Sequence, residues 1–374
     1  MPLDNAKALQ RDGWYFLAAI PGGGAAAVDF ERVVETARST TRAVGGAPRA
    51  SHWLPTDKGW VGRLWDVTSP EEAVAWLEQF ASVLGEGTSI QGRPRKRIAG
   101  HNDPRTTLTL GIAFAADLTQ VPDAERGHVW AVEDDLTRDL VERAAGWLDL
   151  PGAKHYYWHG LWSTPTLGVP PVASLAQVVP DRCNETILTA LRTKPVRNRV
   201  VDFERQGRVT CQDVDPALGP RDQLALLLEC VAWRPDAIDY AFITFDHGGM
   251  GNVWTGDYAQ YQLPNGLTEP YLRGHRPVLS TRVPDAFGIQ VLTDAHLQHA
   301  HDLTDWTIEE IAPGRHLVTA RDLDPWLVAP GPIHPRNPWR FSPPPAALID
   351  KARADFGDMI TSPQQMDELD PYVP

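Results

Sequence analysis

Apolar residues recur at three- and four-residue intervals in several stretches of the chain, which is the spacing of amphipathic helices. The pattern predicts helices over 28–44 and 70–84. The second is the better marked, because Ser69 can cap its first turn and a regular apolar stripe follows. We expect Leu77 and Phe80, which belong to that stripe, to be buried.

Short runs of β-branched and aromatic residues lie between the helical stretches and predict strands. The mixture of the two patterns predicts an α+β fold. The remaining predicted elements are helices over 134–148, 220–231 and 346–356 and strands over 107–114, 155–159 and 240–245.

A length of 374 residues favours two domains over one core. Prolines, glycine and serine cluster in 166–180, which we interpret as a linker. The expected organisation is an α+β unit over 1–165, this linker, a second α+β unit over 181–330, and a proline-rich C-terminal extension with a short helix over 331–374.

Two pairs of landmarks raise the hypothesis of a degenerate internal duplication. The dipeptide Asp-Val precedes both the second predicted helix and the helix over 220–231, and the tetrapeptide Val-Pro-Asp-Ala follows at 121–124 and at 283–286. If these landmarks are equivalent, residues 28–165 and 175–330 adopt related folds with a groove between them. Chance matching in a chain rich in alanine and proline is the alternative.

The chain carries 48 acidic and 35 basic residues, which gives a formal net charge of −13. Such a field repels phosphate backbones and anionic membranes, so we expect neither nucleic acid nor a membrane as a partner. The basic run 93–97 contains a proline and no aromatic residue, and we interpret it as an exposed loop. The composition favours a protein partner.

Cys183, Cys211 and Cys230 are three widely spaced cysteines without a Cys-x-x-Cys pair. This pattern is typical neither of a disulfide framework nor of a thiolate zinc site, so we expect three free thiols. The first residues lack the order of a secretion signal, and no apolar run approaches the roughly 20 residues of a membrane span. These observations predict a cytoplasmic protein.

The local sequence most typical of an enzyme is Asp246-His247 followed by two glycines, directly after the strand predicted over 240–245. Catalytic groups often lie on loops at strand ends, and a carboxylate beside an imidazole can serve as an acid and base pair. The alternative is a simple glycine turn after the strand.

Histidines suggest two metal sites, and both have a simpler interpretation. His296 and His299 would share one face of a helix and could chelate, but a structural site needs four ligands and a catalytic one usually three. His155 and His159 have chelating spacing only on a helix, whereas their aromatic neighbours favour a strand. We therefore expect no bound metal and no other cofactor, since the glycines at 22–24 lack the residues of a phosphate loop.

The 14 tryptophans are the remaining unusual feature. Most are expected in the core, but Trp60, Trp162 and Trp254 lie in segments rich in glycine or proline and are the candidates for a binding surface.

These observations favour a non-enzymatic cytoplasmic protein-binding module, of inhibitor, immunity or adaptor type, with an acidic surface that carries tryptophan. One alternative is a hydrolase or metal-assisted enzyme with a site around Asp246, His247, His296 and His299. Such an enzyme should bring these distant residues into one pocket. The other alternative is a protein that binds a carbohydrate or another small ligand in an aromatic cleft.

Overall fold

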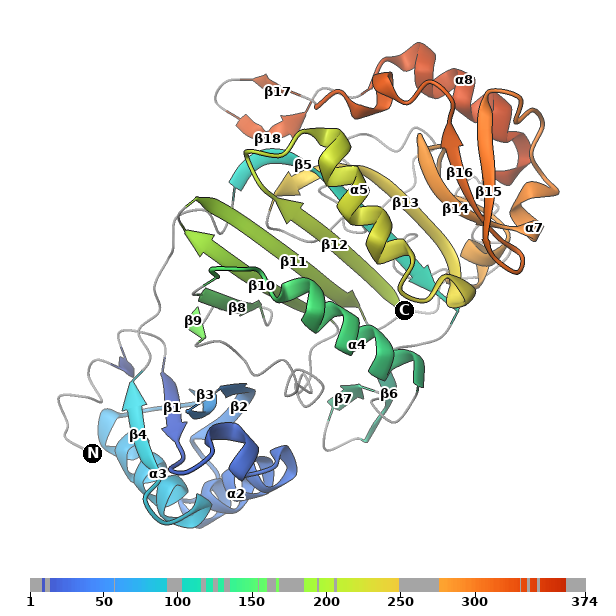
Figure 1. Cartoon of the computed structure of the whole chain (residues 1–374). Coiled ribbons are helices and arrows are strands. Elements are labelled where there is room, and N and C mark those ends of the chain that lie inside the picture. Colours follow the sequence, from blue (N-terminus) through green and yellow to red (C-terminus); the bar gives the residue numbers. More distant parts are fainter. Residues whose placement is uncertain are drawn as a thin grey trace. The chain divides into compact units, whose positions relative to one another are not determined.

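The computed structural model is drawn in Figure 1, coloured along the sequence. Its chain divides into two compact units, Met1–Ile98 with Gln120–Thr193 and Ala99–Thr119 with Lys194–Pro374. Both units are mixed α+β. The structure describes residues 9–10, 14–56, 58–92, 103–115, 119–123, 127–130, 135–153, 155–159, 166–167, 185–193, 195–204, 207–248, 276–329, 331–334, 337–341 and 344–360.

The units are not the two consecutive segments expected from the sequence. Strand β5 (Asp103–Phe114) belongs to the second unit, because it pairs with two strands that follow it by about a hundred residues. Strand β10 (Glu185–Thr193) belongs to the first. Of the expected linker 166–180, the described residues include only strand β9 (Thr166–Leu167).

The first unit begins with a four-stranded antiparallel sheet in the order β2-β3-β1-β4. Along the chain the elements alternate in the order β-α-β-β-α-β, the ferredoxin-like or split β-α-β arrangement. They are β1 (Tyr15–Ala19), the 3-10 helix η1 (Gly24–Ala27), α2 (Phe30–Ala43), β2 (Arg49–Thr56), β3 (Gly59–Trp65), α3 (Pro70–Leu84) and β4 (Ser89–Gly92).

Helix α3 begins and ends as the sequence predicts. The Ser69 hydroxyl accepts a hydrogen bond from the backbone N–H of Glu72 at 3.2 Å, and a proline occupies the first turn. Leu77 and Phe80 are fully buried, which confirms their assignment to the apolar stripe. They pack in a core where Phe80 stacks on Trp53 and Trp76, with ring centroids 5.3 and 5.0 Å apart.

The rest of the first unit contains β7 (Gly127–Trp130), paired in a small sheet with β6 (Thr119–Asp123), the helix α4 (Asp135–Leu148), and β8 (His155–His159). β8 lies between β9 and β10 and is antiparallel to both. The segment 155–159 is therefore a strand, as predicted, and residues four apart on a strand are about 13 Å apart.

The second unit contains the same strand order in its central part, β11-β12-β5-β13, again antiparallel throughout. The pairing extends past β13 through β14 and β16 to β15. The elements are β11 (Val196–Glu204), β12 (Arg208–Val214), α5 (Pro220–Val231), η3 (Pro235–Ala237), β13 (Ile238–Gly248), β14 (Ile289–Thr293), β15 (Trp306–Ala312) and β16 (Arg315–Ala320).

Strand order therefore relates 15–92 to 103–248, rather than 28–165 to 175–330. Along the chain, both segments have a hairpin, then a helix (α3 or α5), then a last strand. In the sheet, the first strand of each segment lies between the hairpin and the last strand. The Asp-Val landmark falls at equivalent places in this comparison. The Val-Pro-Asp-Ala landmark does not, because 121–123 lies in a strand and 283–286 lies in a loop before β14. Common descent of the two segments remains a hypothesis.

The C-terminal segment is part of the second unit rather than an extension. Helix α8 (Ala346–Phe356) has the predicted bounds, and Phe356 is fully buried with its ring centroid 4.6 Å from that of Trp306. The other short elements here are η5 (Arg276–Ser280), α7 (Asp294–Leu297), η6 (Asp324–Leu327), β17 (Pro332–His334), β18 (Asn337–Phe341) and η7 (Gly357–Met359).

Among the described helices, none combines the length and the apolar character needed to cross a membrane.

Candidate functional site

Asp246 and His247 lie within a strand and not in a loop. β13 continues to Gly248, past the end predicted at residue 245, because Asp246 and His247 stay in register with Thr107 and Thr106 of β5. The Asp246 side chain is 3% exposed. The predicted loop placement was therefore wrong.

His296 and His299 do not form a chelating pair on one helix face. Helix α7 ends at Leu297, and His299 lies in the turn that follows. Nδ1 of His296 accepts the backbone N–H of Thr293 at 2.9 Å, so its Nε2 carries the proton and faces the carbonyl oxygen of Arg282 at 3.3 Å. Both ring nitrogens are used within the fold. The described residues contain no cluster of three or more side chains suited to a metal ion.

The buried imidazole of His296 completes a capping box at the start of α7, in which the Thr293 hydroxyl faces the backbone N–H of His296 in return. Burial of the ring lowers the pKa of His296 to about 4, since the surroundings disfavour the charged form. His296 is thus a neutral structural residue of the second unit.

We expect His296 to make stability depend on pH. The folded pKa of about 4 is below the unfolded value of about 6.5, so the contribution is complete above pH 6.5 and is lost as the pH falls toward 4. Between pH 7 and 4.5, wild type should lose about 2 to 3 kcal/mol more unfolding free energy than His296→Gln, as measured by urea unfolding. Equal losses in the two proteins would contradict this assignment.

The enzyme hypothesis required Asp246 and His296 to share a pocket. The His296 ring lies beside Tyr240 near the start of β13, with centroids 6.1 Å apart. Asp246 is six residues further along the same strand, or roughly 20 Å away at the rise of a β-strand. The structure therefore does not bring the two candidates together.

Trp60 belongs to the core of the first unit. Its side chain is fully buried on β3, and its Nε1 donates to the carbonyl oxygen of Val28 at 2.9 Å. Trp162 and Trp254 lie outside the described residues.

The thiols of Cys211 and Cys230 are free and buried, as expected, whereas Cys183 lies outside the described residues. Burial, and then the hydrogen bond with Cys211, raises the pKa of the Cys230 thiol well above its usual value. A buried thiol that stays protonated is a poor nucleophile.

The central sheet of the second unit has two different faces. One face packs against α5, whose Leu224 and Leu227 are buried, and it presents apolar residues such as Leu110 and Ile243. Cys211 of β12 points to this face, because its side chain is hydrogen-bonded to Cys230 of α5. Residues on the other face alternate with these along each strand.

The other face is polar and nevertheless buried. We call the polar residues of this side of the sheet the polar face. None of these residues is more than 3% exposed. A sheet face in contact with water is commonly polar, but a buried one is commonly apolar. The polar face consists of Thr107 and Thr109 of β5, Asn198 and Asp202 of β11, Arg208, Thr210 and Gln212 of β12, and Asp246 of β13.

Strand register places Thr210 at the centre of the polar face. It lies directly between Asp202 on β11 and Gly111 on β5, and Gln212 donates to Thr109 one step along, at 2.8 Å. The Thr210 hydroxyl is buried and has no hydrogen-bond partner in the part of the chain that the structure describes. A buried hydroxyl without a partner costs about 1 to 3 kcal/mol, so its retention needs a reason.

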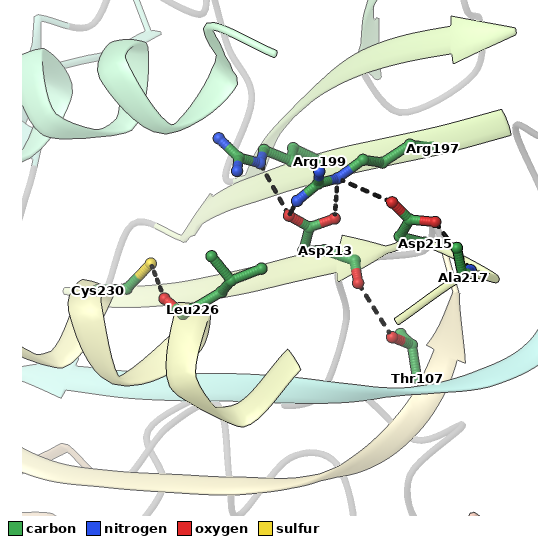
Figure 2. Close-up of polar contacts among 8 residues, drawn as sticks. All are labelled: Thr107, Arg197, Arg199, Asp213, Asp215, Ala217, Leu226 and Cys230. Carbon is green, nitrogen blue, oxygen red and sulfur yellow. Dashed lines mark hydrogen bonds and ion pairs between the residues drawn. The ribbon is translucent and has the colours of Figure 1, made fainter. Parts of the chain in front are cut away.

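A second polar cluster lies on the α5 side, at the ends of β11 and β12 (Figure 2). Both oxygens of Asp213 face Arg197, at 2.8 and 2.5 Å, and one also accepts from Nε of Arg199 at 2.9 Å. Asp215 lies 3.5 Å from Arg197 and accepts the backbone N–H of Ala217. The hydrogen bond to Asp213 is the main cause that raises the pKa of Arg197. The two carboxylates of this cluster balance the charges of its two guanidinium groups, so we interpret the cluster as structural.

The sequence contains a signal for the polar face. Polar and apolar residues alternate from Thr107 to Leu110 and from Arg208 to Cys211. Such alternation alone predicts a strand with one face in water. Only the burial of the polar positions distinguishes this face from an ordinary exposed one.

A scan against protein-family models, a search of curated proteins and a search of solved structures each found no match to this chain.

Proposed function

We propose that the second unit binds a small, neutral, polyhydroxylated ligand, of the size of a monosaccharide, on the polar face. The observation that carries the proposal is the unpartnered hydroxyl of Thr210, buried at the centre of a sheet face that gathers carboxylate, guanidinium, amide and hydroxyl groups. A ligand hydroxyl that meets Thr210 would remove the cost of that buried group.

The mixture of groups on the polar face favours a polyol over a charged ligand. Asp202 and Asp246 are acceptors and Arg208 is a donor, so two negative charges and one positive charge leave a single formal negative charge. Each ligand hydroxyl can both donate and accept, and it therefore matches a surface on which the two kinds of group alternate. The row from β11 to β13 spans three strand spacings, or about 14 Å, which is longer than one sugar ring.

Gly111 supports the same location. It lies opposite Thr210 in the interior of β5. Glycine within a strand often marks a place where a ligand or another backbone approaches closely, because no side chain occupies the space above it.

This proposal develops the small-ligand alternative from the sequence and relocates it from an aromatic cleft to a polar sheet face. Asp246, singled out as an acid or base, becomes one of the groups that would bind the ligand. The protein-binding hypothesis from the sequence, which relied on an acidic surface that carries tryptophan, stays a prediction.

The test is a titration of the whole chain with D-glucose, D-galactose, D-mannose, D-ribose and myo-inositol by isothermal calorimetry. Thr210→Val keeps the side-chain shape and removes only the hydroxyl. We expect it to weaken binding of the recognised polyol by about tenfold, the effect of one hydrogen bond of about 1.4 kcal/mol. Without ligand, the variant should be as stable as wild type or more stable, since it removes an unpartnered group.

Thr319→Val on β16 is the matched control, because it makes the same change on a strand outside the polar face. It should leave the affinity within a factor of two. Equal binding by wild type and Thr210→Val, or no binding of any of the five polyols at 10 mM, would argue against the proposal.

A further inference from the structure

Strand β15 forms an edge of the sheet in the second unit. It pairs with β16 on one side, and no strand among the described residues pairs with its other side. Arg315, opposite Ala312, donates to the carbonyl oxygen of Ile238, so η3 lies near the Ala312 end of the strand. The middle of the edge is a row of backbone groups of the kind to which a further strand can add.

The middle of β15 is exposed on both faces. Residues 307–310 are four consecutive exposed positions, whereas a strand with one covered face would alternate between buried and exposed. Ile308 is 44% exposed although it lies directly across from Val318, which is fully buried in the core. An added strand would extend this face and cover Ile308.

The negative charges of Glu309 and Glu310 favour a partner strand that carries positive charge. They are adjacent, so they point to opposite faces of the edge and place a negative charge on each. Pairing of β15 with β15 of a second copy would bring these glutamates near their own counterparts, and like charges across strands are destabilising. Lysine or arginine at two adjacent positions of a partner strand would instead place a positive charge beside each glutamate.

We propose that β15 is a docking edge for an extended basic segment of another protein, which adds to the sheet as a further strand through main-chain hydrogen bonds. An apolar residue of that segment covers Ile308, and its basic residues pair with Glu309 and Glu310. The recognition is strand addition, in which the backbone supplies affinity and side chains supply selectivity. This inference is independent of the polyol proposed above, since it uses other residues.

The probe is a fluorescently labelled eight-residue peptide that repeats valine-lysine-lysine, with both termini blocked, so that a valine can face Ile308 while adjacent lysines face Glu309 and Glu310. Its binding to the whole chain is measured by fluorescence anisotropy in 50 mM and 500 mM salt. We expect Glu309→Lys/Glu310→Lys to bind at least tenfold more weakly, and wild type to lose affinity in high salt because exposed charges are screened. A peptide with N-methyl groups on alternate residues, which removes the donors along one edge, should also bind at least tenfold more weakly.

Glu31→Lys/Glu35→Lys is the matched control, because it makes the same change in net charge at exposed positions of α2. It should stay within threefold of wild type. Equal affinity of the methylated and unmethylated peptides would show attraction by charge without strand addition and would overturn the proposal. So would equal binding to the Glu309→Lys/Glu310→Lys variant, no binding at 1 mM peptide, or a dimer in sedimentation that Ile308→Pro dissociates.

Discussion

Asp213→Ala should destabilise the second unit by about 3 to 5 kcal/mol, because it removes one partner of a buried ion pair. The Asp213 side chain is fully buried and faces two arginines, Arg197 and Arg199, which are themselves only 17% and 16% exposed. Removal of the carboxylate takes this ion-pair partner away from two partly buried cations, while Asp215 still lies 3.5 Å from Arg197.

The measurement is chemical unfolding followed by circular dichroism, with attention to the transition of the second unit. Asp305→Asn in the same unit is the matched control. It weakens an ion pair with Lys351 whose side chains are 67% and 56% exposed, and such pairs contribute about 0 to 1 kcal/mol. If Asp213→Ala costs no more than this control, the cluster contributes little and its arginines are solvated.

Leu77→Ala should lower the unfolding free energy of the first unit by about 2 to 5 kcal/mol. Leu77 is fully buried on the inner face of α3, beside the stacked rings of Trp76 and Phe80. These large rigid rings cannot close fully around a lost side chain, so we expect a cavity and a cost toward the upper end of the range.

Val83→Ala on the same helix is the control for Leu77→Ala, because Val83 is 46% exposed. It should change the unfolding free energy by less than about 0.5 kcal/mol. Urea unfolding monitored by tryptophan fluorescence, to which Trp53 and Trp76 of this core contribute, measures both. A cost below about 0.5 kcal/mol for Leu77→Ala would mean that the stripe is not packed in solution.

Local patterns predicted the helices well, because capping and apolar spacing act within a few residues of one another. The bounds of α3, α5 and α8 agree with the sequence prediction at both ends. The strand β8 was also predicted correctly, from its aromatic residues.

Pairing between distant strands could not be predicted in the same way. Nothing local to 103–114 indicates that its partners are β12 and β13, so the expected division into consecutive halves was wrong at this point. The end of β13 was missed for the same reason, since it is pairing with β5 that keeps Asp246 and His247 in the strand.

The candidate site was only partly predictable. Asp246 was identified from its position after an apolar run, but Thr210 and Arg208 look like the exposed half of an ordinary alternating strand. Their significance comes from what covers them, and burial of a sheet face is a tertiary property. His296 shows the converse, because its metal-like spacing is explained by a capping box that includes Thr293.

The place of β5 between β12 and β13 has a consequence for synthesis on the ribosome. Thr107 of β5 and Asp213 of β12 are 106 residues apart. At a translation rate of about 5 to 20 residues per second, β5 leaves the ribosome roughly 5 to 20 seconds before its first partner exists. A strand with one apolar side that waits this long is exposed to aggregation. The nascent chain should therefore depend on a chaperone over this interval.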